Sequence, residues 1–323
     1  MSTRLAVYEL ARAHGLARPA TQSLLDAASL EQEPPALQQW LWPAIAVLSA
    51  TLVGLGVILW LAANWDTLGR AGRFALLQGV IVVMCVGAAA RPRLRPALGL
   101  LALLCIGGLF AYFGQTYQTG ADAWQLFAVW ALLALPLCFG ARSDVLWAPW
   151  SLVVMTAISL WVFAHTSHRW RAEPQDTDVY FMAWTASAIV VFALSPAFAR
   201  FTGAGPWAMR TAVTLAVIGM SFSALVALFG HDVASQYGLA VALLGAGAAA
   251  LAQRRFFDVF ALSAVALSLD TLLVGGLARA LFNSGGSDFV GRLLMIGLVA
   301  AAILAVSVSL IMKLARKHAG KDA

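Results

Sequence analysis

The stretch that decides the fold is VFALSAVALSLDTLLVGGLA, residues 259–278. A helix of about 20 apolar residues spans the hydrocarbon core of a bilayer, which is roughly 30 Å thick. Lipid offers no hydrogen-bond partners, so the backbone polar groups of such a stretch must bond to one another. The stretch is therefore predicted to be a transmembrane helix, and its one ionisable residue is Asp270.

Asp270 is the residue in this stretch that a membrane location does not explain. A carboxylate near the bilayer midplane costs about 2.5–3.5 kcal/mol. Arg279 lies about 13 Å further along the same helix, so a partner must come from another span. The polar candidates are Gln78, Thr156, Ser221 and Ser223. Without a partner the carboxyl should be protonated, because desolvation disfavours the charged form. Asp270 is then either a group that loads and releases a proton during transport or a neutral, hydrogen-bonded structural acid.

The whole chain has the composition of a membrane protein, with 61% apolar residues, 11% charged residues and a mean hydropathy of +0.83. Soluble proteins average about 45–50% apolar and about 25% charged residues. The apolar residues form long blocks separated by polar breaks. We predict an all-α, polytopic transmembrane helix bundle over residues 42–312, preceded by a segment 1–41 and followed by a basic tail 313–323. The ten candidate spans are 42–63, 72–90, 97–113, 124–140, 145–164, 180–199, 211–229, 236–252, 258–280 and 290–312.

The Lys and Arg residues predict the orientation of this bundle. With ten spans and the N-terminus in the cytoplasm, 15 of the 21 Lys and Arg residues lie in cytoplasmic segments. Such a bias follows the positive-inside rule. Both termini are therefore predicted to be cytoplasmic.

Residues 1–41 are predicted to form a short cytosolic helical hairpin and a linker. Gly15 suits the end of a first helix, and Pro19 suits the first turn of a second. Two short helices could also indicate DNA binding. This segment, however, carries three arginines against four acidic residues, the wrong balance for phosphate contacts. We therefore expect the hairpin to pack on itself or on a protein partner, and no nucleic acid.

A second candidate site lies in two short loops that the topology places on the outer side. Their residues could form an outer polar cup, in which Arg73 and Asp122 could pair. The cup residues are Asn64, Asp66, Arg73, Gln115, Tyr117 and Asp122. A purely structural interpretation stays open: Asp122 with Gln125 fits a helix N-cap and its capping partner, and Asn64 fits a helix C-cap.

Features of enzymes and metal sites are sparse. The histidines and cysteines do not have metal-ligand spacing, and no phosphate loop or nucleophile elbow is present. These residues are His14, His165, His168, His231, His318, Cys85, Cys105 and Cys138. We therefore predict no metal and no cofactor, and favour a protein that is not an enzyme.

The two loop regions also carry a family resemblance. GLGVILWLAANW (54–65) with RFALL (73–77), and FGQTYQTGADAWQLFAVWALLALPL (113–137), resemble the sequence blocks of a bacterial polytopic membrane-protein family named domain of unknown function twenty-one fifty-seven. The resemblance covers about residues 1–140. It implies a bacterial inner-membrane protein and no particular activity.

Two functional hypotheses follow. The first is a membrane scaffold or envelope sensor that uses the hairpin as its cytosolic contact. The alternative is a proton-coupled or small-solute transporter with Asp270 as its intramembrane acid. The lipid bilayer is the predicted partner, other membrane proteins are candidates, and no substrate is predicted. We favour the first hypothesis, because no repeat or discontinuous helix of the kind found in transporters is visible.

Overall fold

The computed structural model describes residues 3–27, 35–64, 69–117, 120, 122–166, 173–230, 235–253, 256–283 and 289–319. In these residues the secondary structure is helical throughout. The N-terminal half contains α1 (Thr3–Ala13), α2 (Arg18–Ala27), α3 (Pro35–Ala63), α4 (Arg70–Ala90), η1 (Pro92–Leu94), α5 (Arg95–Tyr117), α6 (Ala123–Ala141) and α7 (Asp144–His165). The C-terminal half contains η2 (Pro174–Asp176), α8 (Thr177–Ala193), α9 (Ala199–Thr202), α10 (Pro206–Leu228), α11 (Ser235–Leu251), α12 (Val259–Asn283) and α13 (Phe289–Ala319).

Each of the ten predicted spans overlaps one of these helices, although the predicted span 180–199 runs beyond the end of α8 at Ala193. Within the described residues, seven helical segments are long and apolar enough to cross a membrane: α4, α5 together with η1, α6, α7, α10, α12 and α13. The apolar parts of α3 and α11 are shorter, and α8 has 17 residues. The helical membrane fold is thus confirmed, while the count of ten spans stays a prediction.

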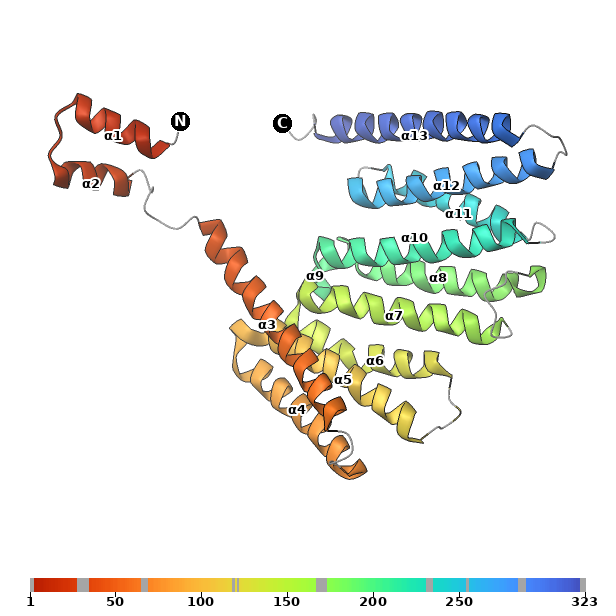
Figure 1. The fold of residues 1–323 in the computed structure, drawn as a ribbon, viewed down its shortest axis with the longest axis horizontal. Coiled ribbons are helices and arrows are strands. Elements are labelled where there is room, and N and C mark those ends of the chain that lie inside the picture. Colours follow the sequence, from red (N-terminus) through yellow and green to blue (C-terminus); the bar gives the residue numbers. More distant parts are fainter. Residues whose placement is uncertain are drawn as a thin grey trace.

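The long helices pack side by side in an extended array (Figure 1). Contacts run in sequence from α4 to α5, α6, α7, α10, α12 and α13. α8 packs against α7 and α10, α11 packs against α10 and α12, and α3 crosses α5. α5, α7, α10 and α12 end on the right of Figure 1, where α6, α8, α11 and α13 begin, and both termini lie away from that side. The array therefore has two ends, and successive connections between the long helices alternate between them.

Small residues bring the helices close together at the centre of the array. Ala134, Ala208 and Ala212 are completely or almost completely buried beside Leu146 and Trp147. Small side chains let helix backbones approach closely. In lipid the hydrophobic effect does not drive helices together, so van der Waals contacts between closely packed helices stabilise the fold instead. The core therefore depends on shape and close packing more than on the amount of apolar surface buried.

The outer surface of the array is apolar. On α13, Val290, Leu294 and Leu298 are 73%, 66% and 64% exposed. These residues follow one another at four-residue spacing and so share one face of the helix. An exposed apolar face of this kind suits contact with lipid chains.

Polar side chains fasten the helix ends on the side that holds the start of α7 and of α10. The carboxylate of Asp144 accepts hydrogen bonds from the backbone N–H groups of Gly205 (2.6 Å) and Trp207 (3.0 Å), at the start of α10. Arg210 and Asp258 form an ion pair of 3.1 Å, and Asp258 also accepts from the N–H of Ala261 at 2.8 Å. Each carboxylate satisfies backbone donors that a helix start leaves unpaired.

The N-terminal segment contains α1 and α2, which contact each other. Gly15 has a φ of +61°, and Leu16 N–H donates to the Ala11 carbonyl at 2.9 Å. These features are typical of a helix that ends at a left-handed glycine. The cytosolic placement of this segment and its role as a separate hairpin stay predictions.

Candidate functional site

Asp270 lies on the side of α12 that contacts α13. Its side chain is 8% exposed, and Oδ1 accepts a hydrogen bond of 2.9 Å from the Ser307 hydroxyl. Oδ2 is buried and has no hydrogen-bond partner among the described residues. The contact with α13 makes Asp270 part of a helix interface.

The partner of Asp270 comes from another helix, as predicted, but it is none of the four candidate residues. Ser221 pairs with the Ser268 hydroxyl, Thr156 donates to the Leu152 carbonyl at 2.8 Å, and Ser223 donates to the Gly219 carbonyl at 3.0 Å. Gln78 is exposed on α4. A signal for Ser307 was present in the sequence. In an antiparallel helix pair Asp270 faces the middle of α13, and Ser307 is the first polar residue after Arg292.

The structure brings together the start of α4 and the end of α5, which carry part of the outer polar cup. The ring centroid of Phe74 lies 4.7 Å from that of Tyr112 and 5.8 Å from that of Tyr117. The Arg73 guanidinium lies 5.9 Å from the Tyr112 ring centroid, a distance compatible with a cation–π contact. Arg73 and Tyr117 therefore share one end of the array, as their short loops suggested.

The structure does not bring the other residues of the outer polar cup together in the same way. Asn64 donates to the Trp60 carbonyl at 3.0 Å, and Gln115 is exposed. Asp122 occupies the N-cap position of α6, but its side chain makes no capping hydrogen bond, so the predicted capping pair with Gln125 is wrong. Asp66 lies outside the described residues. A binding role for the cup stays a prediction.

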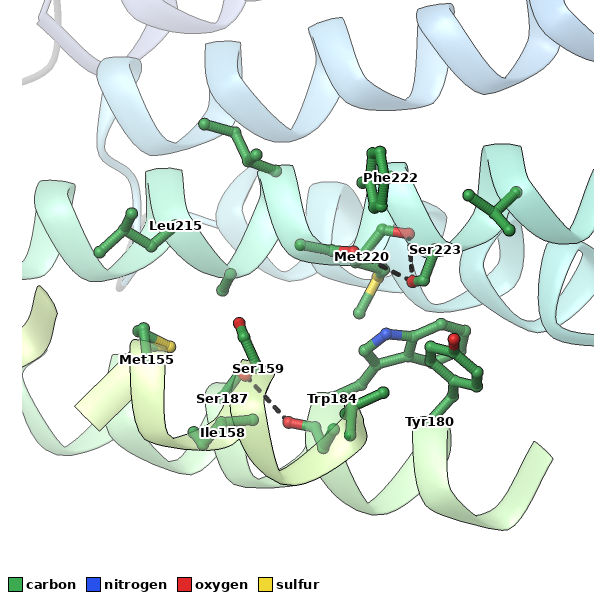
Figure 2. Close-up of a pocket in the computed structure, with 16 residues that line it drawn as sticks. Met155, Ile158, Ser159, Tyr180, Trp184, Ser187, Leu215, Met220, Phe222 and Ser223 are labelled. Atoms are coloured by element: carbon green, nitrogen blue, oxygen red, sulfur yellow. Dashed lines mark hydrogen bonds between the residues drawn. The ribbon is translucent and has the colours of Figure 1, made fainter. Parts of the chain in front are cut away.

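A cavity that the sequence analysis missed lies between α7, α8 and α10 (Figure 2). Its volume is about 430 Å³. At one end the rings of Tyr180 and Trp184 lie side by side, with centroids 6.1 Å apart, and at the other end are Met155 and Leu215. The cavity is thus elongated along the helices. We call it the α8–α10 cavity.

The chemistry of the α8–α10 cavity is apolar. Its polar side-chain groups are a few hydroxyls and the indole N–H of Trp184, and the hydroxyls of Ser187 and Ser223 donate to carbonyls of their own helices. The rim includes Ile218 and Phe222, which are 59% and 55% exposed. Apolar walls beside an exposed apolar rim suit a hydrocarbon chain better than an ion or a sugar.

A second cavity of about 430 Å³ lies between α6, α7 and α8. Its lining is almost entirely apolar and includes Trp124, Trp150 and Trp161. Ile158 and Ala183 line both cavities, so the contact between α7 and α8 separates them. Asp270 lines neither cavity.

Comparisons with known proteins agree with the membrane fold. A family model described as "Predicted membrane protein (DUF2157)" matches residues 8–147. This match confirms the resemblance found in the sequence over the N-terminal part of the chain. The chain is therefore a membrane protein with several apolar helices, and the similarity to the DUF2157 model is confined to its N-terminal part. No curated protein and no solved structure matches it.

The matched segment and the cavities lie in different parts of the chain. Residues 8–147 contain all six residues of the outer polar cup. The α8–α10 cavity is built from residues beyond the match, beginning with Met155, and Asp270 also lies beyond it.

Proposed function

We propose that this protein is a lipid-responsive scaffold or envelope sensor in the bacterial inner membrane, with both termini in the cytoplasm. The observation that carries this proposal is the apolar α8–α10 cavity, which lies between α7, α8 and α10 and has an exposed apolar rim. The excess of Lys and Arg residues in the predicted cytoplasmic segments supports the orientation.

The placement of the polar groups favours sensing over transport. A pathway for ions or polar solutes needs polar groups along its wall. Asp270 instead faces Ser307 in a helix interface, and the wall of the α8–α10 cavity is mainly apolar. A hydrocarbon chain entering this cavity contacts α7, α8 and α10 together. A ligand that binds one arrangement of these helices more tightly shifts the population toward that arrangement.

The proposal is tested by photo-crosslinking. The protein is reconstituted into vesicles that contain phosphatidylglycerol with a diazirine on one acyl chain, and crosslinked peptides are identified by mass spectrometry. We expect crosslinks at residues that line the α8–α10 cavity, such as Met155, Ser187 and Met220.

Gly219 and Gly79 provide a matched pair of variants. Both are exposed, and a Cβ on either meets no atom within 4 Å. Gly219→Leu would place a side chain in the α8–α10 cavity, whereas Gly79→Leu lies on α4, away from it. We expect Gly219→Leu to abolish the cavity crosslinks and Gly79→Leu to keep them. Unchanged crosslinking in Gly219→Leu would contradict lipid entry.

The scaffold part of the proposal concerns α1 and α2. Deleting residues 1–34 removes both helices and stops before α3 begins at Pro35. We expect the truncated protein to keep the melting temperature of the bundle and to lose membrane proteins that co-purify with the full chain. Retention of the same partners would show that these helices are not the contact.

One observation favours the alternative of a proton-coupled transporter. The buried Oδ2 of Asp270 has no hydrogen-bond partner in the described part of the chain, and acidic residues within membrane spans often mark pathways for ions or substrates. In this case Asp270→Asn should abolish a pH-dependent flux in proteoliposomes. Absence of any flux in the parent protein would exclude this alternative.

A further inference from the structure

Arg95 and Arg142 lie where α5 begins and α6 ends, and Arg142 contacts the backbone of Arg200 on α9. Arg95 donates from Nε to the Ala88 carbonyl at 3.2 Å and from Nη1 to the Gly140 carbonyl at 3.5 Å. Two residues after Gly140, Arg142 donates from Nη2 to the backbone carbonyl of Arg200. This chain of contacts joins the ends of α4 and α6 to α9, and we call Arg95, Arg142 and Arg200 the arginine cluster.

The backbone at Arg142 packs closely against the turn that follows α9. Arg142 has a left-handed φ of +48° at the end of α6, and Gly203 follows α9 with a φ of +68°. The two residues touch so closely that a Cβ on Gly203 would lie 2.3 Å from the Arg142 Cβ. Trp147 Nε1 also donates to the Thr202 carbonyl at 2.9 Å. The cluster is thus built on a fixed turn.

In the described part of the chain, the arginine cluster is not paired with acidic side chains. Among the described residues, none forms an ion pair with Arg95, Arg142 or Arg200, whereas Arg210 on the same side of the array pairs with Asp258. Asp144 is near in sequence, but its two oxygens accept from Gly205 and Trp207. A guanidinium has five N–H donors, so each of the three retains donors for an external acceptor.

Exposed aromatic side chains border the arginine cluster. Phe201 on α9 and Trp207 on α10 are 69% and 62% exposed, and Phe139 near the end of α6 is 47% exposed. Aromatic side chains of this kind are enriched where a bilayer meets water. Exposed aromatic side chains beside the cluster are what we expect of a site at the level of lipid headgroups, with apolar surface for the lipid chains.

We propose that the arginine cluster binds the headgroup phosphate of an anionic phospholipid. Guanidinium groups bind phosphate through paired, charge-assisted hydrogen bonds, and basic sites between membrane helices are suited to anionic headgroups. This site is separate from the α8–α10 cavity, so it does not depend on acyl-chain entry there.

The test is native mass spectrometry of the full-length protein released from detergent, which counts bound lipids. The probes are phosphatidylglycerol and phosphatidylcholine, added separately. We expect phosphatidylglycerol to bind more tightly, and R142Q/R200Q to weaken it by about tenfold for each guanidinium removed. R316Q/K317Q is the matched control, because it removes two positive charges from the end of α13, outside the cluster. It should keep the affinity of the parent protein.

A single variant keeps the test decisive if R142Q/R200Q fails to fold. The Arg200 side chain is exposed and makes no hydrogen bond within the described residues, so R200Q should leave the fold intact and still weaken binding. Equal binding of both lipids, or equal losses in R200Q and R316Q/K317Q, would overturn the proposal. Competition by inorganic phosphate at the same concentration would show a free-phosphate site and would also overturn it.

Discussion

Ser307 on α13 donates a hydrogen bond of 2.9 Å to Oδ1 of Asp270 on α12. α13 lies at the edge of the array and exposes most of its surface. A hydrogen-bonded polar pair has one favourable register, in addition to the close packing of the apolar side chains around it. The contact between Asp270 and Ser307 therefore sets how α13 sits on α12.

The first prediction concerns the strength of this contact. Interhelical hydrogen bonds in membranes contribute about 0.6 kcal/mol on average and up to about 1.7 kcal/mol. Ser307→Ala should lower the free energy of unfolding by an amount in this range. A double-mutant cycle with Asp270→Ala, measured by unfolding in mixed micelles, should give a coupling energy of the same size. Strict additivity of the two changes would show that the bond contributes nothing to stability.

The second prediction separates backbone strain from a steric clash at Gly203. Gly120 and Gly203 both have positive φ, but a Cβ on Gly120 meets nothing, whereas one on Gly203 meets Arg142. Gly120→Ala should cost only the left-handed backbone penalty, about 1–2 kcal/mol. Gly203→Ala should cost a further 1–3 kcal/mol, roughly, because the turn must move. If thermal unfolding shows that Gly120→Ala and Gly203→Ala lose the same free energy of unfolding, the close approach of Gly203 to Arg142 is unimportant.

The third prediction concerns which helix ends share a side of the membrane. In a variant without Cys85, Cys105 and Cys138, single cysteines are placed at exposed positions near the helix ends. Gly69→Cys and Asp122→Cys should react with an impermeant maleimide on intact spheroplasts. Gly140→Cys, at the other end of α6, should react only after permeabilisation. Labelling of Gly69→Cys and Asp122→Cys from opposite faces would reject the shared outer end.

The fourth prediction is a pH dependence from Asp176, which precedes α8. Burial raises the pKa of Asp176 above its usual value of 3.8, the charge of Glu173 raises it further, and a backbone hydrogen bond at Glu173 opposes the rise. A raised carboxyl pKa in the folded state adds stability below the unfolded value, and this stability is lost as pH rises through the folded value. Asp176→Asn should therefore flatten the fall in melting temperature as pH rises above about 4. Asp178 is a nearby exposed residue, and the melting temperature of Asp178→Asn should still fall with rising pH as it does in the parent protein.

The helices were predictable from the sequence because their cause is local. An apolar block of about 20 residues in lipid must satisfy its own backbone hydrogen bonds, and each of the ten predicted blocks contains a long helix. The proximity of Arg73 and Tyr117 was also predictable, because short loops return the chain to the same end. Neither inference requires knowledge of how distant helices pack.

The sites that depend on packing between helices were not predictable in the same way. Ser307 was missed as the partner of Asp270, because that choice depends on the register of α12 against α13. The α8–α10 cavity was missed because ordinary apolar residues from three helices enclose it, and no short motif marks them. The arginine cluster likewise forms only when α9 packs against the end of α6.

The sequence alone determined that the chain is a helical membrane protein, because the bilayer acts on each apolar stretch independently of the others. Only the tertiary structure decided which side chains meet, because contacts between helices depend on small differences in shape and register along the whole array. Asp270 illustrates both: its position within a span follows from the residues around it, and its bond to Ser307 follows from how α13 packs on α12.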